Sequence, residues 1–94
     1  MTVKGYNGWA NWETWNVNLW LDNEEPLYRE KVRFLQWWRG DITADIVEEF
    51  CKSQFPDGTP DMRSDERETV AQQWAKVDWS ELATAWESEA KEYE

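Results

Sequence analysis

The sequence contains no histidine, one cysteine (Cys51) and no hydrophobic run that approaches membrane-spanning length. Without histidine, Ser–His and Cys–His catalysis are excluded, and only one thiolate is left as a ligand for zinc. One cysteine cannot form an internal disulfide, which favours a reducing cytoplasm. A membrane span needs about 20 apolar residues, and the N-terminus lacks the basic-then-apolar pattern of a signal peptide. We therefore expect a cytoplasmic protein without contact to a membrane.

Positive charge is also scarce. Ten Lys and Arg residues face twenty Asp and Glu residues, so the net charge is −10. Direct binding to nucleic acid is excluded by this balance, because the chain repels phosphate rather than neutralising it. The whole excess lies in residues 41–94, which hold five basic and fifteen acidic residues, whereas residues 1–40 hold five of each. Such asymmetry favours a partner surface, although a solvated face is the commoner cause.

The chain is rich in tryptophan, with nine among 94 residues. Its apolar residues recur at helical spacing. The length suits one domain. The pattern predicts an all-α fold, a single small compact helical domain over residues 1–94 with about five helices around a Trp-rich central helix. Residues 2–4 could add a short extended piece. The expected helices cover residues 12–22, 24–39, about 43–54, 64–75 and 79–93.

Helix caps and apolar faces follow from the same pattern. We expect Asn11, Asn23, Ser64 and Asp78 as N-caps, the last in a capping box with Glu81, and either Asp41 or Thr43 at the start of the third helix. The central helix is apolar on two faces, so only its polar ridge meets water: Thr14, Asn18 and Asp22. The second helix presents one core stripe and ends at Gly40: Leu27, Phe34, Leu35 and Trp38. Residues 55–60 form a turn.

Catalysis and metal binding find little support. Adjacent acids such as Glu48 and Glu49 do not face each other on a helix, and helical first turns attract acids for electrostatic reasons alone. Asp57 and Asp61 are too sparse for a calcium loop, and Cys51 lies on an apolar face, as a small core residue does. We expect no enzyme, no cofactor and no metal.

Trp37 stands apart from the other tryptophans. It lies about 100° around its helix from Trp38, on the flank of the core stripe. Trp and Arg are favoured in interface hot spots, and Arg29 and Arg33 lie on the same helix. Trp37 is therefore a candidate interface anchor, and a peripheral core contact is the alternative.

Acidic residues at helical spacing supply the other candidate surface. Carboxylates three or four residues apart stand about 5–6 Å from each other, comparable to successive phosphates of a strand, so such rows could occupy a basic nucleic-acid channel of another protein. The rows are Asp41-Asp45-Glu48/Glu49, Asp61-Asp65-Glu68, and Glu81, Glu87, Glu92 and Glu94. The alternative is that the acids only keep the domain in solution. The candidate partner-binding residues are Asp61, Asp65, Glu66, Glu68, Glu81, Glu87, Glu92 and Trp37.

Two segments carry a resemblance. They resemble segments of a family of small proteins carried by phages and plasmids. The first segment is Tyr6-Asn7-Gly8-Trp9 followed by Asn11-x-x-Thr14-Trp15-Asn16-Val17-x-Leu19-Trp20-Leu21-x-Asn23-Glu24, and the second is Val77-Asp78-Trp79-Ser80-Glu81-Leu82-Ala83. Residues 25–76 match it only loosely. The resemblance implies a mobile-element origin and a place in the bacterial host cytoplasm. Small acidic phage proteins often inhibit host defence, as antirestriction and anti-CRISPR proteins do.

Charge and resemblance together predict a non-enzymatic inhibitor of a host defence protein that handles nucleic acid, bound through the acidic surface as a nucleic-acid mimic. The alternative is a structural or interaction module of a phage or plasmid with Trp37 at its interface. The chain would be a monomer or a homodimer. A third reading, an enzyme with paired carboxylates, would need a pocket that joins acids from different helices.

Overall fold

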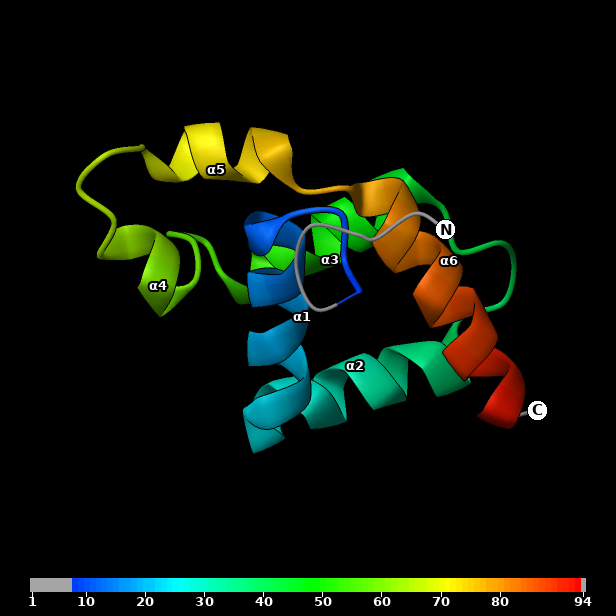
Figure 1. Ribbon diagram of the computed structural model, residues 1–94. Coiled ribbons are helices and arrows are strands. Elements are labelled where there is room, and N and C mark those ends of the chain that lie inside the picture. Colours follow the sequence, from blue (N-terminus) through cyan, green and yellow to red (C-terminus); the bar gives the residue numbers. More distant parts are fainter. Residues whose placement is uncertain (1–7, 94) are drawn as a thin grey trace.

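The computed structural model describes residues 8–93, and this range folds into six α-helices and one short 3₁₀ helix, with no strand (Figure 1). The all-α prediction is confirmed. The expected extended piece at residues 2–4, and Glu94, lie outside the described residues. The elements are α1 (Trp12–Asn23), α2 (Glu25–Trp37), α3 (Ala44–Gln54), α4 (Pro60–Arg63), α5 (Val70–Lys76), α6 (Trp79–Ala90) and η1 (Lys91–Tyr93).

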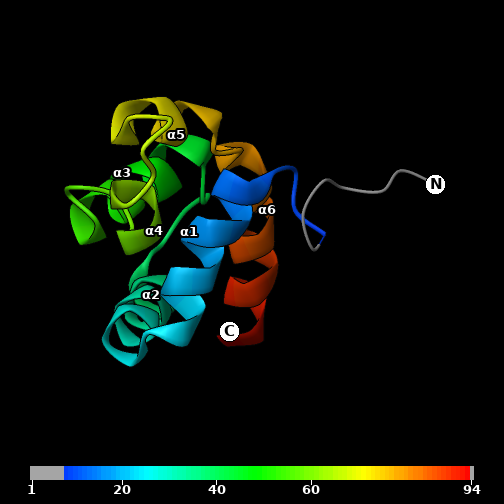
Figure 2. The same cartoon turned by 60° about the vertical axis from the view of Figure 1, so that its left-hand side comes forward.

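Two helices share the centre of the molecule. Helix α1 contacts α2, α5 and α6, and α6 contacts α1, α2 and α3. The closest packing joins α1 to α2 and α3 to α6. In Figure 1, α2 crosses below α1, α3 lies behind it, and α5 closes the top, while Figure 2 shows α1 and α6 side by side. The expected central helix therefore exists, but α6 is as central as α1.

The core is aliphatic around α1 and aromatic around α6. Val17, Leu21 and Leu82 are fully buried. Trp86 is 1% exposed and meets Phe50 edge-on, with ring centroids 5.4 Å apart. Offset and edge-on aromatic pairs contribute about 0.5–1.5 kcal/mol beyond their buried area. Residues from all six α-helices and from the connections between them therefore close one continuous core.

The expected helix over residues 64–75 is wrong. The chain instead forms α4 and α5, with an irregular connection between them. Thr59 caps α4 by accepting from the amide of Met62, and Thr69 with Gln72 forms a capping box at α5. Ser64, expected as an N-cap, ends α4. Thr59 and Thr69 are N-caps ten residues apart, and each starts its own short helix. These two caps outweigh the apolar periodicity that predicted one helix over the segment.

Of the other helix ends expected from the sequence, some are confirmed and some lie at different residues. Asn11 caps α1 by accepting from the Thr14 amide, and Asp78 caps α6 by accepting from the Glu81 amide. Asn23 is the last residue of α1, and Glu24 precedes α2 without a side-chain cap. Gly40 has a φ of 129°, as a left-handed stop requires, but α2 already ends at Trp37.

The polar ridge of α1 faces water only in part, since Asp22 is exposed and Asn18 is half-buried. Thr14 is fully buried. Its hydroxyl donates to Asn11 Oδ1 at 2.6 Å and accepts from the Asp78 amide at 2.8 Å. Since both hydrogen-bonding directions are satisfied inside the protein, burial costs the hydroxyl little. Thr14 therefore fixes the start of α6 against α1.

The core stripe of α2 also contains a residue that its apolar pattern omits. Lys31 is 1% exposed, and its Nζ lies 2.6 Å from Asp22 Oδ1 and 3.0 Å from Glu89 Oε1. Burial by itself lowers the pKa of Lys31, but hydrogen bonds and charges from Asp22 and Glu89 outweigh it, so the pKa is raised. The ammonium group stays charged and joins α1, α2 and α6.

Candidate protein-binding surface

The tryptophan-rich segment at the N-terminus of α1 points its polar groups inward. Asn16 is fully buried, and its Nδ2 donates to Asp61 Oδ2 at 2.6 Å. Trp20 Nε1 donates to the same oxygen at 3.0 Å, and Thr59 Oγ1 donates to Asn16 Oδ1 at 2.6 Å. Asn11 Nδ2 reaches the Lys76 carbonyl at 2.6 Å. These hydrogen bonds join α1 to α4 and α5. The polar residues of this segment therefore stabilise the fold and do not form a contact surface for a partner.

Most of the predicted partner-binding acids are engaged within the protein. Asp61 accepts from Asn16 and Trp20, as above. Glu81 Oε1 accepts from the Ala10 amide at 2.8 Å, and Glu87 Oε1 accepts from the Ile42 amide at 2.9 Å. Both glutamates are half-buried, so the expected outward row on the last helix does not form. A carboxylate aimed at a backbone amide is a local structural group first.

The expected row Asp61-Asp65-Glu68 does not form either, because residues 64–69 are not helical. Asp65 Oδ1 accepts from the Arg67 amide at 2.7 Å, and its carboxylate lies 4.0 Å from Arg67 Nε. Glu68 pairs with Lys76. The pKa of Lys76 is raised, chiefly by that hydrogen bond. Of the predicted acids, only Glu66 and Glu92 are exposed and without a partner in the described part of the chain.

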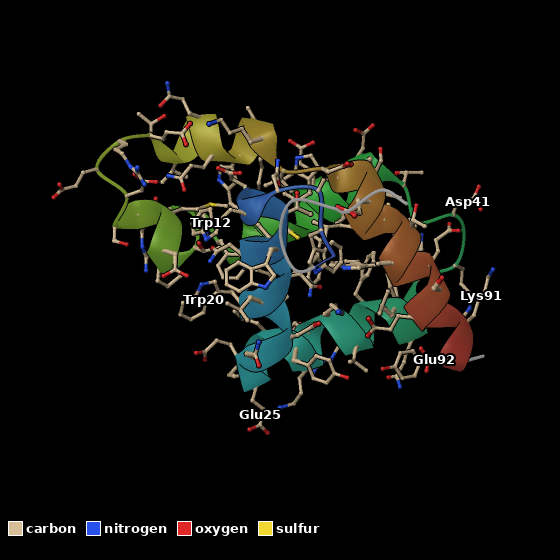
Figure 3. The ribbon with its side chains drawn as sticks, viewed as in Figure 1. Trp12, Trp20, Glu25, Asp41, Lys91 and Glu92 are labelled. Atoms are coloured by element: carbon tan, nitrogen blue, oxygen red, sulfur yellow. The ribbon has the colours of Figure 1, made fainter. Side chains whose placement is uncertain are left out.

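An acidic surface remains on α3. Asp45 and Glu49 are exposed and lie one turn apart, and their carboxylates make no hydrogen bond or ion pair within residues 8–93. Asp41, also exposed and unpaired in that range, precedes the helix. Figure 3 shows Asp41 pointing away from the molecule. Glu48 is paired with Lys52 at 2.6 Å. Of the three acidic rows expected from the sequence, the row Asp41-Asp45-Glu48/Glu49 therefore keeps the most unpaired carboxylates in the described residues.

A groove opens where α1 meets the connection between α4 and α5. It is open to solvent and has a volume of about 650 Å³. Its lining residues are Trp12, Trp15, Asp61, Ser64, Asp65, Glu66 and Arg67. Figure 3 shows Trp12 and Trp20 on the side of α1 toward α4. The sequence alone did not predict this groove, because it depends on the non-helical path of residues 64–69.

Trp37 is exposed, as expected of an interface anchor. Its exposed fraction is 72%, the largest of any described large hydrophobic residue. Arg33 and Arg29, one and two turns earlier on α2, are exposed and pair with Glu30 and Glu25 on the same helix. Trp37, Trp38 and Arg39 line a shallow hollow of about 360 Å³. The C-terminal end of α2 thus presents an aromatic and basic patch on an acidic protein.

A cysteine thiol and clustered carboxylates are the groups of this chain that could supply nucleophilic or metal chemistry. Cys51 is fully buried in the core, as predicted, and burial raises the pKa of its thiol. A thiol protonated in this way is a poor nucleophile. Within the described range, no three Cys, Asp or Glu side chains gather closely enough to hold a metal ion. No helix there is long and apolar enough to span a bilayer.

The sequence was compared with known families, curated proteins and solved structures. Residues 2–88 match the model of a family of unknown function, DUF7249, and the chain belongs to this family. The match covers the N-terminal segment and all the helices up to most of α6. No curated protein and no solved structure matches.

Proposed function

We propose that this DUF7249 member acts by binding a protein and catalyses no reaction. It is an inhibitor encoded by a phage or another mobile element, and it occupies the basic nucleic-acid-binding surface of a host defence protein. The observation that carries the proposal is the acidic surface of α3, where Asp45 and Glu49 stand free on successive turns with Asp41 beside the helix start.

The distribution of charge supports an electrostatic partner. Seven exposed acids have a carboxylate that makes no hydrogen bond or ion pair within residues 8–93: Glu24, Asp41, Asp45, Glu49, Asp57, Glu66 and Glu92. Three exposed cations there lack an acidic partner: Arg39, Arg63 and Lys91. Uncompensated charge of one sign steers association with a surface of opposite sign and can raise on-rates by about 10–1000-fold.

The rigidity of the scaffold supports mimicry in particular. Carboxylates on successive turns of a helix are held about 5–6 Å apart. Helix α3 is fixed by Val47 and Cys51, which are fully buried against the core. A competitor built on a rigid element loses less conformational entropy on binding than a flexible acidic tail does. The acidic side of α3 is therefore suited to displace a strand of phosphates.

Charge reversal on α3 tests this proposal. The variant Asp45→Lys/Glu49→Lys is compared with wild type and with Glu24→Lys/Asp57→Lys, which makes the same change in net charge at exposed, unpaired positions elsewhere. Each protein is used to capture partners from a bacterial lysate, identified by mass spectrometry. We expect wild type and the control to retain a nucleic-acid-binding protein that duplex DNA displaces, and the α3 variant to lose it. Equal capture by both variants contradicts the proposal.

The aromatic patch favours a second candidate function, an interaction module that self-associates or joins a larger assembly. The observation that supports this second function is the 72% exposed fraction of the Trp37 side chain. Sedimentation velocity separates the two candidates. A stable homodimer that Trp37→Ala converts to a monomer supports the interaction module, and a monomer at all concentrations contradicts its self-associating form.

A further inference from the structure

We propose that the groove between α1 and the α4–α5 connection binds the side chain of an arginine from a basic polypeptide segment. The inference rests on the proposed function in one respect, that the partner is basic, and it assigns a specific recognition site to that partner. The groove combines the two features that a guanidinium group requires, which are aromatic surface and accessible carboxylate oxygens.

The aromatic part comes from α1. Trp12 and Trp15 are three residues apart, on one side of the helix, and both are half-buried and line the groove. A guanidinium ion over an indole face is attracted by the quadrupole of the ring, and Trp is the strongest of the aromatic side chains in this role. Two indoles held by the first turns of a capped helix form a fixed platform, because Asn11 anchors the start of α1.

The carboxylate part comes from α4 and the residues after it. Asp61 is oriented through Oδ2 by two neutral donors, Asn16 and Trp20, while Oδ1 accepts no hydrogen bond within the described range. Neutral donors position the carboxylate without cancelling its charge. Glu66 is exposed and unpaired in that range, and Asp65 uses Oδ1 for the Arg67 amide. The groove therefore carries three carboxylates, and the most firmly oriented one has an open acceptor atom.

The groove contains one cation of its own, and it is held loosely. Arg67 has a side chain that is 93% exposed, and its Nε lies 4.0 Å from Asp65 Oδ1. An exposed pair at this distance contributes little. An incoming guanidinium can therefore replace it and gain the forked, two-point contact with a carboxylate that distinguishes arginine from lysine.

Other ligand classes fit less well. An anion would be repelled by Asp61, Asp65 and Glu66. A neutral apolar group would cover the two indoles but would also remove water from the carboxylates without replacing their hydrogen bonds. A planar cation satisfies both parts of the lining, so the chemistry selects it.

The test uses a capped tetra-arginine peptide and a capped tetra-citrulline peptide. Citrulline keeps the length and planarity of arginine but carries no charge. Binding is followed by NMR through the indole N–H signals of Trp12 and Trp15, assigned with single Trp→Phe variants. We expect tetra-arginine to shift both signals and tetra-citrulline to leave them unchanged.

Two variants with equal charge loss locate the site. Asp65→Asn/Glu66→Gln removes two groove charges and keeps the Oδ1 acceptor for Arg67, whereas Asp45→Asn/Glu49→Gln removes two charges from α3. We expect the groove variant to weaken the indole response to tetra-arginine about tenfold, and the α3 variant to change it less than about threefold. Circular dichroism confirms that both remain helical.

The outcomes separate this proposal from the function proposed above. If tetra-arginine shifts backbone amides of α3 but not the indoles of Trp12 and Trp15, or if tetra-citrulline gives the same shifts, the groove proposal is overturned while the α3 surface stands. If the indoles respond as expected but no nucleic-acid-binding protein is captured from lysate, the groove proposal is supported and the inhibitor function fails.

Discussion

Lys31 Nζ and Glu89 Oε1 lie 3.0 Å apart, which joins α2 to α6 through a lysine that is 1% exposed. The same nitrogen lies 2.6 Å from Asp22 at the end of α1 and 5.6 Å from the ring centroid of Trp86. A buried ammonium is costly unless it is paired and hydrogen-bonded. Here two carboxylates and an indole face surround it, so the junction of the three helices depends on one cation.

Replacing Lys31 tests the strength of this junction. We expect Lys31→Ala to lower the free energy of unfolding by about 3 kcal/mol, because it removes the packed stem and leaves two carboxylates without their cation. Lys31→Met, which keeps the stem, should lose clearly less. Urea denaturation measures both. Arg33→Ala, which breaks an exposed pair on the same helix, should change stability by about 0.5 kcal/mol or less. Equal losses for Lys31→Ala and Arg33→Ala would contradict the assignment.

The same lysine predicts a dependence on alkaline pH. Its pKa in the folded protein is raised above the ordinary value of 10.5, since Asp22 and Glu89 together outweigh the effect of burial. A raised pKa stabilises the folded state fully at pH values below 10.5, and this contribution is lost as pH rises through the folded pKa. The stability difference between wild type and Lys31→Met should therefore stay constant from neutral pH to about pH 10 and shrink above it. A difference that shrinks between pH 7 and 9 in urea titrations would contradict this.

The helices were predictable wherever a cap and an apolar stripe agree. Asn11 and Asp78 mark the starts of α1 and α6 in the sequence and in the structure. Thr14 was wrongly expected to face water, and Lys31 was left out of the core stripe, because the partners that satisfy them in the interior come from other helices. Asp22 and Glu89 are nine and 58 positions from Lys31, and Asp78 is 64 from Thr14. Polar residues satisfied by distant partners leave no periodic signal.

The candidate surface was predictable only in part. The exposure of Trp37 follows from its place on the flank of α2, and the acidic row of α3 from helical spacing. The rows containing Asp61 and Glu81 assumed that an acid on a helix faces solvent. Each carboxylate instead accepts from a group at least 41 residues away. The groove beside Trp12 forms because residues 64–69 are not helical. The N-caps Thr59 and Thr69 cause this break, but the apolar spacing of the segment predicts a continuous helix instead.

Asp61 should behave as a structural residue when it is replaced. Asp61→Ala leaves the buried Nδ2 of Asn16 and the Nε1 of Trp20 without their acceptor. An orphaned buried donor costs about 1–3 kcal/mol, so we expect a loss near the upper end of that range in urea denaturation. Asp57→Ala, at an exposed and unpaired position nearby in sequence, is the matched control and should be neutral. A neutral Asp61→Ala would show that these hydrogen bonds contribute nothing.

Cys51 should react only after the protein unfolds. It is fully buried, and burial raises the pKa of its thiol, so both access and thiolate formation are suppressed. We expect an aromatic disulfide reagent to modify the native protein about a thousandfold or more slowly than the unfolded chain, with a rate that follows the unfolded fraction as urea is added. Modification of native protein at the rate of an exposed thiol would contradict the burial of Cys51 in the core.

Gly58 is the position where a single methyl group should be most damaging. Its φ is 83°, and an added Cβ would lie 2.7 Å from Cγ1 and 3.1 Å from Cγ2 of Val70. Gly58→Ala thus combines backbone strain with overpacking, and we expect a loss of about 3 kcal/mol in urea denaturation. Gly8 has a similar φ of 89° with nothing within 4 Å of the added Cβ, so Gly8→Ala should cost only about 1 kcal/mol of strain. Because Val70→Ala removes both clashing methyl groups, the double variant Gly58→Ala/Val70→Ala should lose less than the sum of its single changes, and strict additivity would show that the contact with α5 is not the cause.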